Sequence, residues 1–163
     1  MFLHGDEAFA MKELLSRFQE VRTEFIETLN RFPAPQRGEV LFGNWDLKDV
    51  VAHITGWDRY FVEILDHLES DEEPPYWKNM TGFNEGTLTK SRKSSWESVC
   101  AEFVSGGEEF IRRYADLPSE LWDVRFWKGR SYTPQRMLEI NIHHYGKSHL
   151  VQVRQKLDNL EKS

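Results

Sequence analysis

Residues 46–69 are the stretch that most constrains the fold, because apolar side chains recur in it at steps of three and four. They are Val50, Ile54, Trp57, Phe61, Ile64, Leu65 and Leu68. This spacing lines one face of an amphipathic helix. Asp46 is placed to cap the helix, and Asp49 adds an acid in the first turn, where the helix dipole is positive. We predict a helix over 46–69, with His53 at the edge of its apolar stripe.

Two further segments predict long helices on either side of this one. Residues 6–31 alternate apolar and charged side chains at helical spacing and end before a proline pair. A third helix is predicted to run to about residue 115, opened by a capping box of Ser94 with Glu97. The glycine pair at 106–107 weakens that helix by roughly 1 kcal/mol per residue. Such a pair inside a helix indicates close packing or a local irregularity.

The last helix is predicted to begin with Thr133 as N-cap and Pro134 at its first position, and to run to about residue 160. Residues 76–92 show weak periodicity and are expected to hold one short helix at most. No strand-like alternation is evident. The sequence therefore predicts an all-α protein, a single four-helix-bundle domain over residues 1–163.

Composition excludes several classes of function. The net charge is −6 and no Lys/Arg-rich face stands out, which argues against a nucleic-acid partner. No apolar run approaches 18 residues and the first residues do not resemble a signal peptide, so no membrane association is expected. The single cysteine, Cys100, excludes an internal disulfide and is typical of a reducing compartment. We expect a cytoplasmic protein.

Histidines in the second and last helices are the residues most able to carry chemistry. A bundle builds metal sites from side chains that point inward from facing helices, and His53, His144 and His149 could supply them. Imidazole suits nickel, zinc and iron, and three nitrogens leave a coordination position open. The spacing is irregular, however. His144 lies five residues before His149, about 140° around a regular helix, and the position four residues before is Tyr145.

Two arrangements would resolve this spacing. A π-bulge, favoured by Gly146, would bring residues five apart onto one face and align His144 with His149. Alternatively, the phenol of Tyr145 takes the second position as a ligand or hydrogen-bond donor. A simpler interpretation of His53 and His149 also stands, as hydrogen-bonded histidines on largely apolar helix faces.

Residues 45–57 have the pattern W-x-x-K-D-x-x-x-H-x-x-x-W, which resembles the signature of the DinB/YfiT-like superfamily. The segment from His149 to Val153 is similar to that superfamily's H-x-x-Q-hydrophobic segment. Residues 74–77, 83–85 and 95–97 resemble the branch of ClbS/DfsB-type proteins. The resemblance covers about residues 10–158.

The resemblance implies a four-helix bundle that holds a divalent metal on three histidines. One comes from the second helix and two, spaced four apart, from the last. His53 and His149 match two of these positions, and Tyr145 occupies the third. Activities in the superfamily include thiol-cofactor-dependent transferases and isomerases. The ClbS-like branch includes a self-protection protein that opens a reactive cyclopropane by hydrolysis, without relying on the three-histidine metal site.

These observations predict a hydrolase or transferase that acts on a small electrophilic or thiol-linked substrate in a pocket between the second and last helices. His53 and His149 would bind metal or activate water, with Tyr145 orienting the substrate or donating a proton. The rival prediction is a non-catalytic protein that sequesters a small molecule against aromatic side chains. In a third interpretation the histidines are core hydrogen-bonders, and the bundle mainly forms a homodimer.

Overall fold

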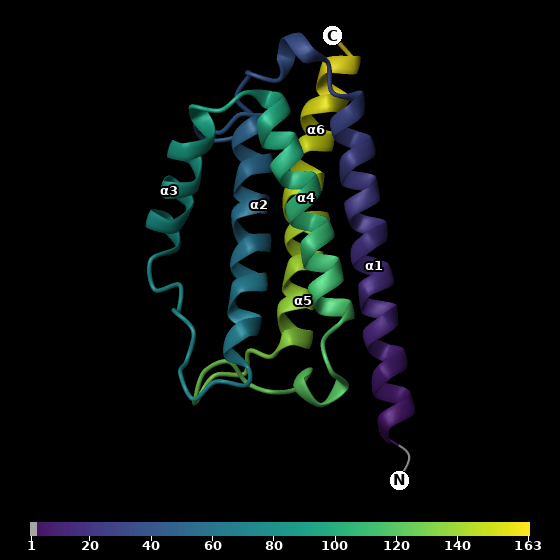
Figure 1. Ribbon diagram of the computed structural model, residues 1–163. Coiled ribbons are helices and arrows are strands. Elements are labelled where there is room, and N and C mark those ends of the chain that lie inside the picture. Colours follow the sequence, from purple (N-terminus) through teal and green to yellow (C-terminus); the bar gives the residue numbers. More distant parts are fainter. Residues whose placement is uncertain (1–2) are drawn as a thin grey trace.

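The computed structural model describes residues 3–163, and the regular elements in that range are helical (Figure 1). The α-helices are α1 (Leu3–Arg31), α2 (Leu47–Glu63), α3 (Met80–Arg92), α4 (Trp96–Ala115), α5 (Pro134–His143) and α6 (Leu150–Glu161). A π-helical turn, η4 (His144–His149), joins α5 to α6. Short 3-10 turns occur at η1 (Ala34–Gln36), η2 (Ile64–His67) and η3 (Ser119–Leu121). The predicted all-α class is confirmed.

Four helical rods form the bundle: α1, α2, α4 and the continuous last helix α5–η4–α6 (Figure 1). The helices α2 and α4 run in the same direction, opposite to α1 and the last helix, and α3 carries the chain back between them. This α3 is the short helix predicted within residues 76–92. It packs on the outside of α2, away from α1. No described helix has an apolar stretch long enough to cross a membrane.

The start of α2 forms as predicted. The side chain of Asp46 accepts a hydrogen bond from the backbone N–H of Asp49 at 2.9 Å, and the Asp49 carboxylate accepts one from the backbone N–H of Asp46 at 3.3 Å. This reciprocal pair satisfies two backbone donors at the helix end. Arg92, the last residue of α3, pairs with Asp49 at 3.1 Å, which ties α3 to the beginning of α2.

The predicted cap of α4 is wrong by one residue. Ser95, not Ser94, is the N-cap, and its hydroxyl accepts from the backbone N–H of Ser98. Ser94 still belongs to the turn that ends α3, because its backbone N–H donates to Ser91 and its hydroxyl to the carbonyl of Lys90. At the last helix, Thr133 caps and Pro134 opens α5 as predicted.

Arg22 of α1 crosses α4 at the glycine pair. Its side chain is buried, and its guanidinium donates to the carbonyls of Phe103 at 3.1 Å and Val104 at 2.9 Å. A Cβ atom at Gly107 would lie 2.0 Å from the Arg22 Nε. The close packing predicted for the glycine pair is therefore confirmed at Gly107, where only the absence of a side chain admits the guanidinium.

Gly107→Ala is expected to destabilise the protein by about 1–3 kcal/mol, because Arg22 must leave its buried carbonyl acceptors. Gly106→Ala is the matched control. A Cβ there would meet only a methyl group of Thr55 at 3.5 Å, and alanine favours a helix over glycine by about 1 kcal/mol. Urea unfolding should therefore move the two midpoints in opposite directions. A common shift would contradict this account of the glycine pair.

Candidate functional site

The last helix changes its hydrogen-bonding pattern where the histidines lie. Residues His144–His149 form the π-helical turn η4, between two regular α-helices. A π turn closes hydrogen bonds between residues five apart, so it brings His144 and His149 to the same face. Of the two arrangements that the spacing left open, the π-bulge is the one that the structure contains.

Three imidazoles converge between α2 and the last helix. The Nε2 atoms of His53 and His144 are 2.8 Å apart, and those of His144 and His149 are 3.0 Å apart. One ligand-capable nitrogen from each ring lies within 4.8 Å of the others. His53 and His149 are buried, and His144 is partly buried. The structure thus brings together the three residues predicted as metal ligands.

Neighbouring groups orient two of these rings. The Nδ1 of His149 lies 2.9 Å from Oε1 of Gln152, an amide oxygen that accepts the Nδ1–H and leaves Nε2 as the free acceptor. The ring of His53 packs edge-on against Trp45, with centroids 4.8 Å apart. The Nδ1 of His53 is buried without a hydrogen-bond partner among the described residues. Its Nε2 is the nitrogen that faces the other histidines.

The rings are held in the neutral form that metal binding requires. Burial lowers the pKa of His53 to about 3, and repulsion by His149 adds to the effect against an opposing contribution from Asn84. Burial also lowers the pKa of His144 to about 2, with further contributions from the neighbouring histidines. Burial lowers the pKa of His149 as well. Three neutral, desolvated imidazoles side by side are poor partners for one another and good ligands for a cation.

The donor set fits a divalent metal ion. Nitrogens bound tetrahedrally at about 2.1 Å from a metal lie about 3.4 Å from one another. The observed Nε2 separations of 2.8 Å (His53–His144) and 3.0 Å (His144–His149) would open by about half an ångström, and the ligand nitrogens of all three rings lie within 4.8 Å of one another. The chemistry of three imidazole nitrogens suits nickel, zinc and iron. His53, His144 and His149 could therefore hold a metal ion.

Tyr145 lies apart from this cluster. Its side chain is fully buried, and its ring packs against Phe18 and Phe25 with centroids 5.1 Å and 5.8 Å away. Its hydroxyl donates a short hydrogen bond to Asp58 of α2. The ligand and proton-donor roles predicted for Tyr145 need an open hydroxyl at the histidines, and the structure places that hydroxyl in the bundle core instead.

Asp58 is a buried carboxylate that the sequence analysis missed. It is completely inaccessible to solvent, and it accepts from the Tyr145 hydroxyl and, at 2.8 Å, from the Asn141 side chain. Burial raises the pKa of Asp58 to about 6, although its two hydrogen bonds and the nearby Arg22 favour the charged form. A signal was available, because Asp58 falls next to Trp57 and four residues after Ile54, within the apolar stripe of α2.

A cavity of about 240 Å³ adjoins the histidines. His53 and His144 form part of its wall, and most of the remainder is apolar. The other lining residues are Trp57, Phe61, Trp77, Met80, Ile140, His143 and Ser148. Trp77, which comes from the segment between α2 and α3, is one of the aromatic residues of this wall. The open side of the histidine cluster therefore faces an apolar space large enough for a small molecule.

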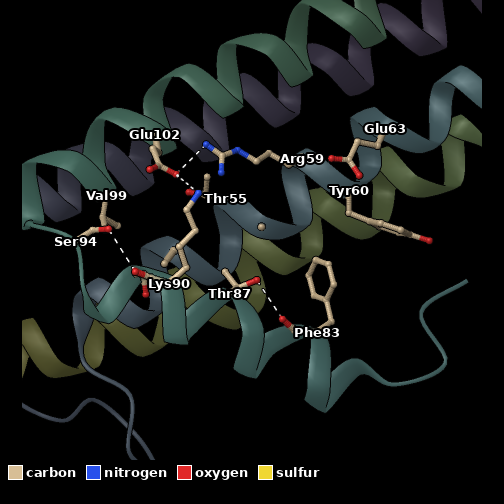
Figure 2. Close-up of a pocket in the computed structure, with 13 residues that line it drawn as sticks. Thr55, Arg59, Tyr60, Glu63, Phe83, Thr87, Lys90, Ser94, Val99 and Glu102 are labelled. Atoms are coloured by element: carbon tan, nitrogen blue, oxygen red, sulfur yellow. Dashed lines mark hydrogen bonds and ion pairs between the residues drawn. The ribbon is translucent and has the colours of Figure 1, made fainter. Parts of the chain in front are cut away.

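A second cavity, of about 220 Å³, lies between α2, α3 and α4 (Figure 2). Three of its charged side chains already pair with one another. Arg59 lies 2.9 Å and Lys90 3.8 Å from the same carboxylate, that of Glu102. None of the three histidines lines it, and its hydroxyls from Thr55 and Thr87 donate to backbone carbonyls within their own helices. The histidine cluster with its adjoining cavity is the candidate site.

Comparison with known protein families shows which family the chain belongs to. The model of the mycothiol maleylpyruvate isomerase N-terminal domain matches residues 18–145. The chain belongs to this family. The family is part of the DinB/YfiT-like superfamily, so the predicted resemblance is confirmed at that level. The matched range includes His53 and His144 and ends before His149.

A solved structure supports the same fold. The crystal structure of an uncharacterised protein from Escherichia coli UTI89 is similar, with a TM-score of 0.77 at 18% identity, over 93% of this chain and 94% of that one. At this identity the likeness shows the fold alone. No significant match was found among curated proteins. The finer assignment to the ClbS/DfsB-type branch stays a prediction.

The raised pKa of Asp58 predicts how stability varies with pH. Because the folded protein holds this proton more tightly than the unfolded chain, the contribution of Asp58 is fully present below pH 4 and is lost as the pH rises through 6. The loss amounts to about 3 kcal/mol. Urea unfolding of wild type and Asp58→Asn between pH 4 and 7 should show the difference in unfolding free energy falling by this amount. A difference that does not vary with pH would contradict the prediction.

Proposed function

We propose that this protein is a metal-dependent hydrolase or group transferase that acts on a small electrophilic or thiol-linked substrate. One observation carries the proposal. Three neutral imidazoles converge through Nε2, and two of them, those of His53 and His144, line an apolar cavity. A purely structural cluster would not need to face a cavity, and a purely apolar binding pocket would not need three desolvated histidines in contact.

Each part of the site has a role in this proposal. A divalent metal held by the three histidine nitrogens would supply Lewis-acid chemistry, polarising a substrate atom or activating water. His53 and His144 line the cavity and would hold the metal beside it, while Gln152 orients the ring of His149. Trp57 and Trp77 supply the apolar surface that binds the substrate body and keeps bulk water away.

The family description supports a thiol-linked substrate. It names mycothiol, a thiol, together with an isomerase. A thiol carried into the cavity would meet the open side of the histidine cluster, where a soft sulfur atom binds well to zinc or nickel. No carboxylate is among the described residues that line the cavity, so the histidines, with the metal they would hold, and Ser148 are the groups available there for proton transfer or activation.

The cavity also supports the alternative of sequestration without turnover. Apart from the histidines and Ser148, its lining is apolar, which favours tight binding of a flat apolar molecule. The two functions differ in one observable result. An enzyme consumes an excess of substrate, whereas a sequestering protein removes at most one equivalent.

Elemental analysis of protein purified without an affinity tag tests the metal site. We expect about one nickel, zinc or iron per chain in the wild type. His144→Ala should lower the affinity by at least about 100-fold, because loss of a ligand costs more than loss of an outer hydrogen bond. His143→Ala is the matched control, since this exposed neighbour lines the cavity but lies outside the cluster. No metal in the wild type would refute metal dependence.

Activity is tested with the metal-loaded protein against a panel of small aromatic electrophiles, with and without added thiol. Turnover that requires the metal and is lost in His144→Ala supports the enzyme. Trp77→Ala should raise KM with little change in kcat, because this side chain binds the substrate body in its ground and transition states alike. Removal of a single equivalent of electrophile, without turnover, would replace the enzyme by the sequestering protein.

A further inference from the structure

The buried residues of the last helix form two series that are out of phase by one position. Those that face the bundle core are Leu138, Asn141 and Tyr145 before the π turn closes, and Leu150, Val153 and Leu157 after it; Met137 is buried beside the first series, and His149 is buried in the turn against the other histidines. The steps within each series are three and four, but the step between Tyr145 and Leu150 is five. In a regular helix one extra residue rotates everything beyond it by about 100°. The packing of α6 therefore requires that one residue be absorbed somewhere in this helix.

Core packing of α6 does not decide where that residue is absorbed. A bulge placed before His144 would turn α6 toward the core equally well. His144 and His149 would then both lie in the regular α-helix that follows the bulge, five residues and about 140° apart. Only a bulge between the two histidines aligns them. The position of the bulge, and not only its existence, determines whether the three imidazoles meet.

We propose that Asp58 is a positioning residue that fixes the bulge between His144 and His149 through its hydrogen bond to Tyr145. This inference rests on the proposed function only for the use of the aligned histidines. Tyr145 is the fully buried residue next to His144, and its hydroxyl reaches Asp58 on the facing helix. With this contact made, the extra residue has to be absorbed after Tyr145.

A second hydrogen bond, from Asn141 to Asp58, fixes which turn of the last helix lies against Asp58. Asn141 lies four residues before Tyr145, one helical turn, and donates to the other oxygen of Asp58 at 2.8 Å. The two oxygens of one carboxylate thus bind two successive turns of the last helix. This ties Tyr145, within the π turn, to the regular turn of α5 that carries Asn141. The residues that follow are Gly146, which has no side chain, and the exposed Lys147, neither of which opposes a change in pitch.

The burial of Asp58 is costly, which argues for a specific role. A carboxylate with no exposure to solvent loses its hydration, and an apolar side chain at the same site would often be more stable. Asp58 does not line the cavity beside the histidines, so substrate binding does not account for it. The ring of Tyr145 already packs against Phe18 and Phe25. The carboxylate adds a directional hydrogen bond, which can form in only one register of the last helix.

Two pairs of variants test this role. Asp58→Asn keeps an oxygen that accepts from Tyr145, whereas Asp58→Leu removes every acceptor while preserving an apolar core. Tyr145→Phe removes only the hydroxyl. Its matched control is Tyr114→Phe, at an equally buried tyrosine of α4 whose hydroxyl donates to the carbonyl of Phe61. Both tyrosine variants lose one buried hydrogen bond, but only one of them touches the last helix.

The register is read in metal-free protein by NMR, from the nuclear Overhauser effect between the ring protons of His144 and His149, whose centroids are 4.6 Å apart. We expect this signal in wild type, Asp58→Asn and Tyr114→Phe, and its loss or marked weakening in Asp58→Leu and Tyr145→Phe. Co²⁺ affinity, measured from visible absorption, should fall at least about 10-fold in the same two variants.

Unchanged ring contacts and Co²⁺ affinity in Asp58→Leu would overturn the proposal. Equal losses in Tyr145→Phe and Tyr114→Phe would also overturn it, because general destabilisation would then explain both. If wild type bound no Co²⁺, the proposed metal function would fail, while the ring-proton signal would still show whether Asp58 sets the register. The two inferences can therefore fail separately.

Discussion

The accommodation of one extra residue in the last helix is the constraint on which the candidate site depends. The π turn η4 absorbs that residue and meets two demands together. It turns Leu150, Val153 and Leu157 of α6 toward the core, and it puts His144 and His149 on the same face. A regular helix would meet neither demand, because residues five apart lie about 140° from each other around it and α6 would face about 100° away from the core. The histidine cluster and the packing of the bundle thus share a single local departure from α-geometry.

Helix α2 joins this site to the rest of the molecule. The helix carries His53, and five residues later it carries Asp58, which contacts the last helix on the core side. Its beginning is fixed by the Asp46–Asp49 capping pair and by Arg92 of α3. One short stretch of sequence therefore sets where α2 starts, how α3 docks and how far His53 reaches toward its partners.

The aromatic wall of the cavity depends on a segment without regular structure. Trp77 follows two prolines whose carbonyls accept hydrogen bonds from the side chains of Trp127, at 2.7 Å, and Tyr60, at 2.5 Å. These contacts join residues 53 and 15 positions apart in the chain. Local spacing carries no information about them. Only the folded chain shows that Trp77 lines the same cavity as His53 and His144.

What the sequence could predict follows the range of the interactions involved. The cap of α2, the start of α5 and the apolar faces of the long helices depend on residues a few positions apart, and they were predicted. The cap of α4 was misplaced because Ser94 and Ser95 both match the local pattern, and contacts to α3 decide between them. Asp58 and Asn141 were not predicted, because their role depends on a hydrogen bond between residues that are 83 positions apart in the sequence. The expected homodimer stays a prediction.

The π turn also has a consequence for how such sites are recognised. The spacing from His144 to His149 is one residue longer than the spacing of four that the resemblance to the DinB/YfiT-like superfamily implies. The extra residue is invisible in the bundle, since the helix on either side keeps its direction and its buried face. Motif searches that require a fixed histidine spacing would discard this chain, although its three imidazoles lie together. Spacing rules for helical metal sites should therefore count turns rather than residues.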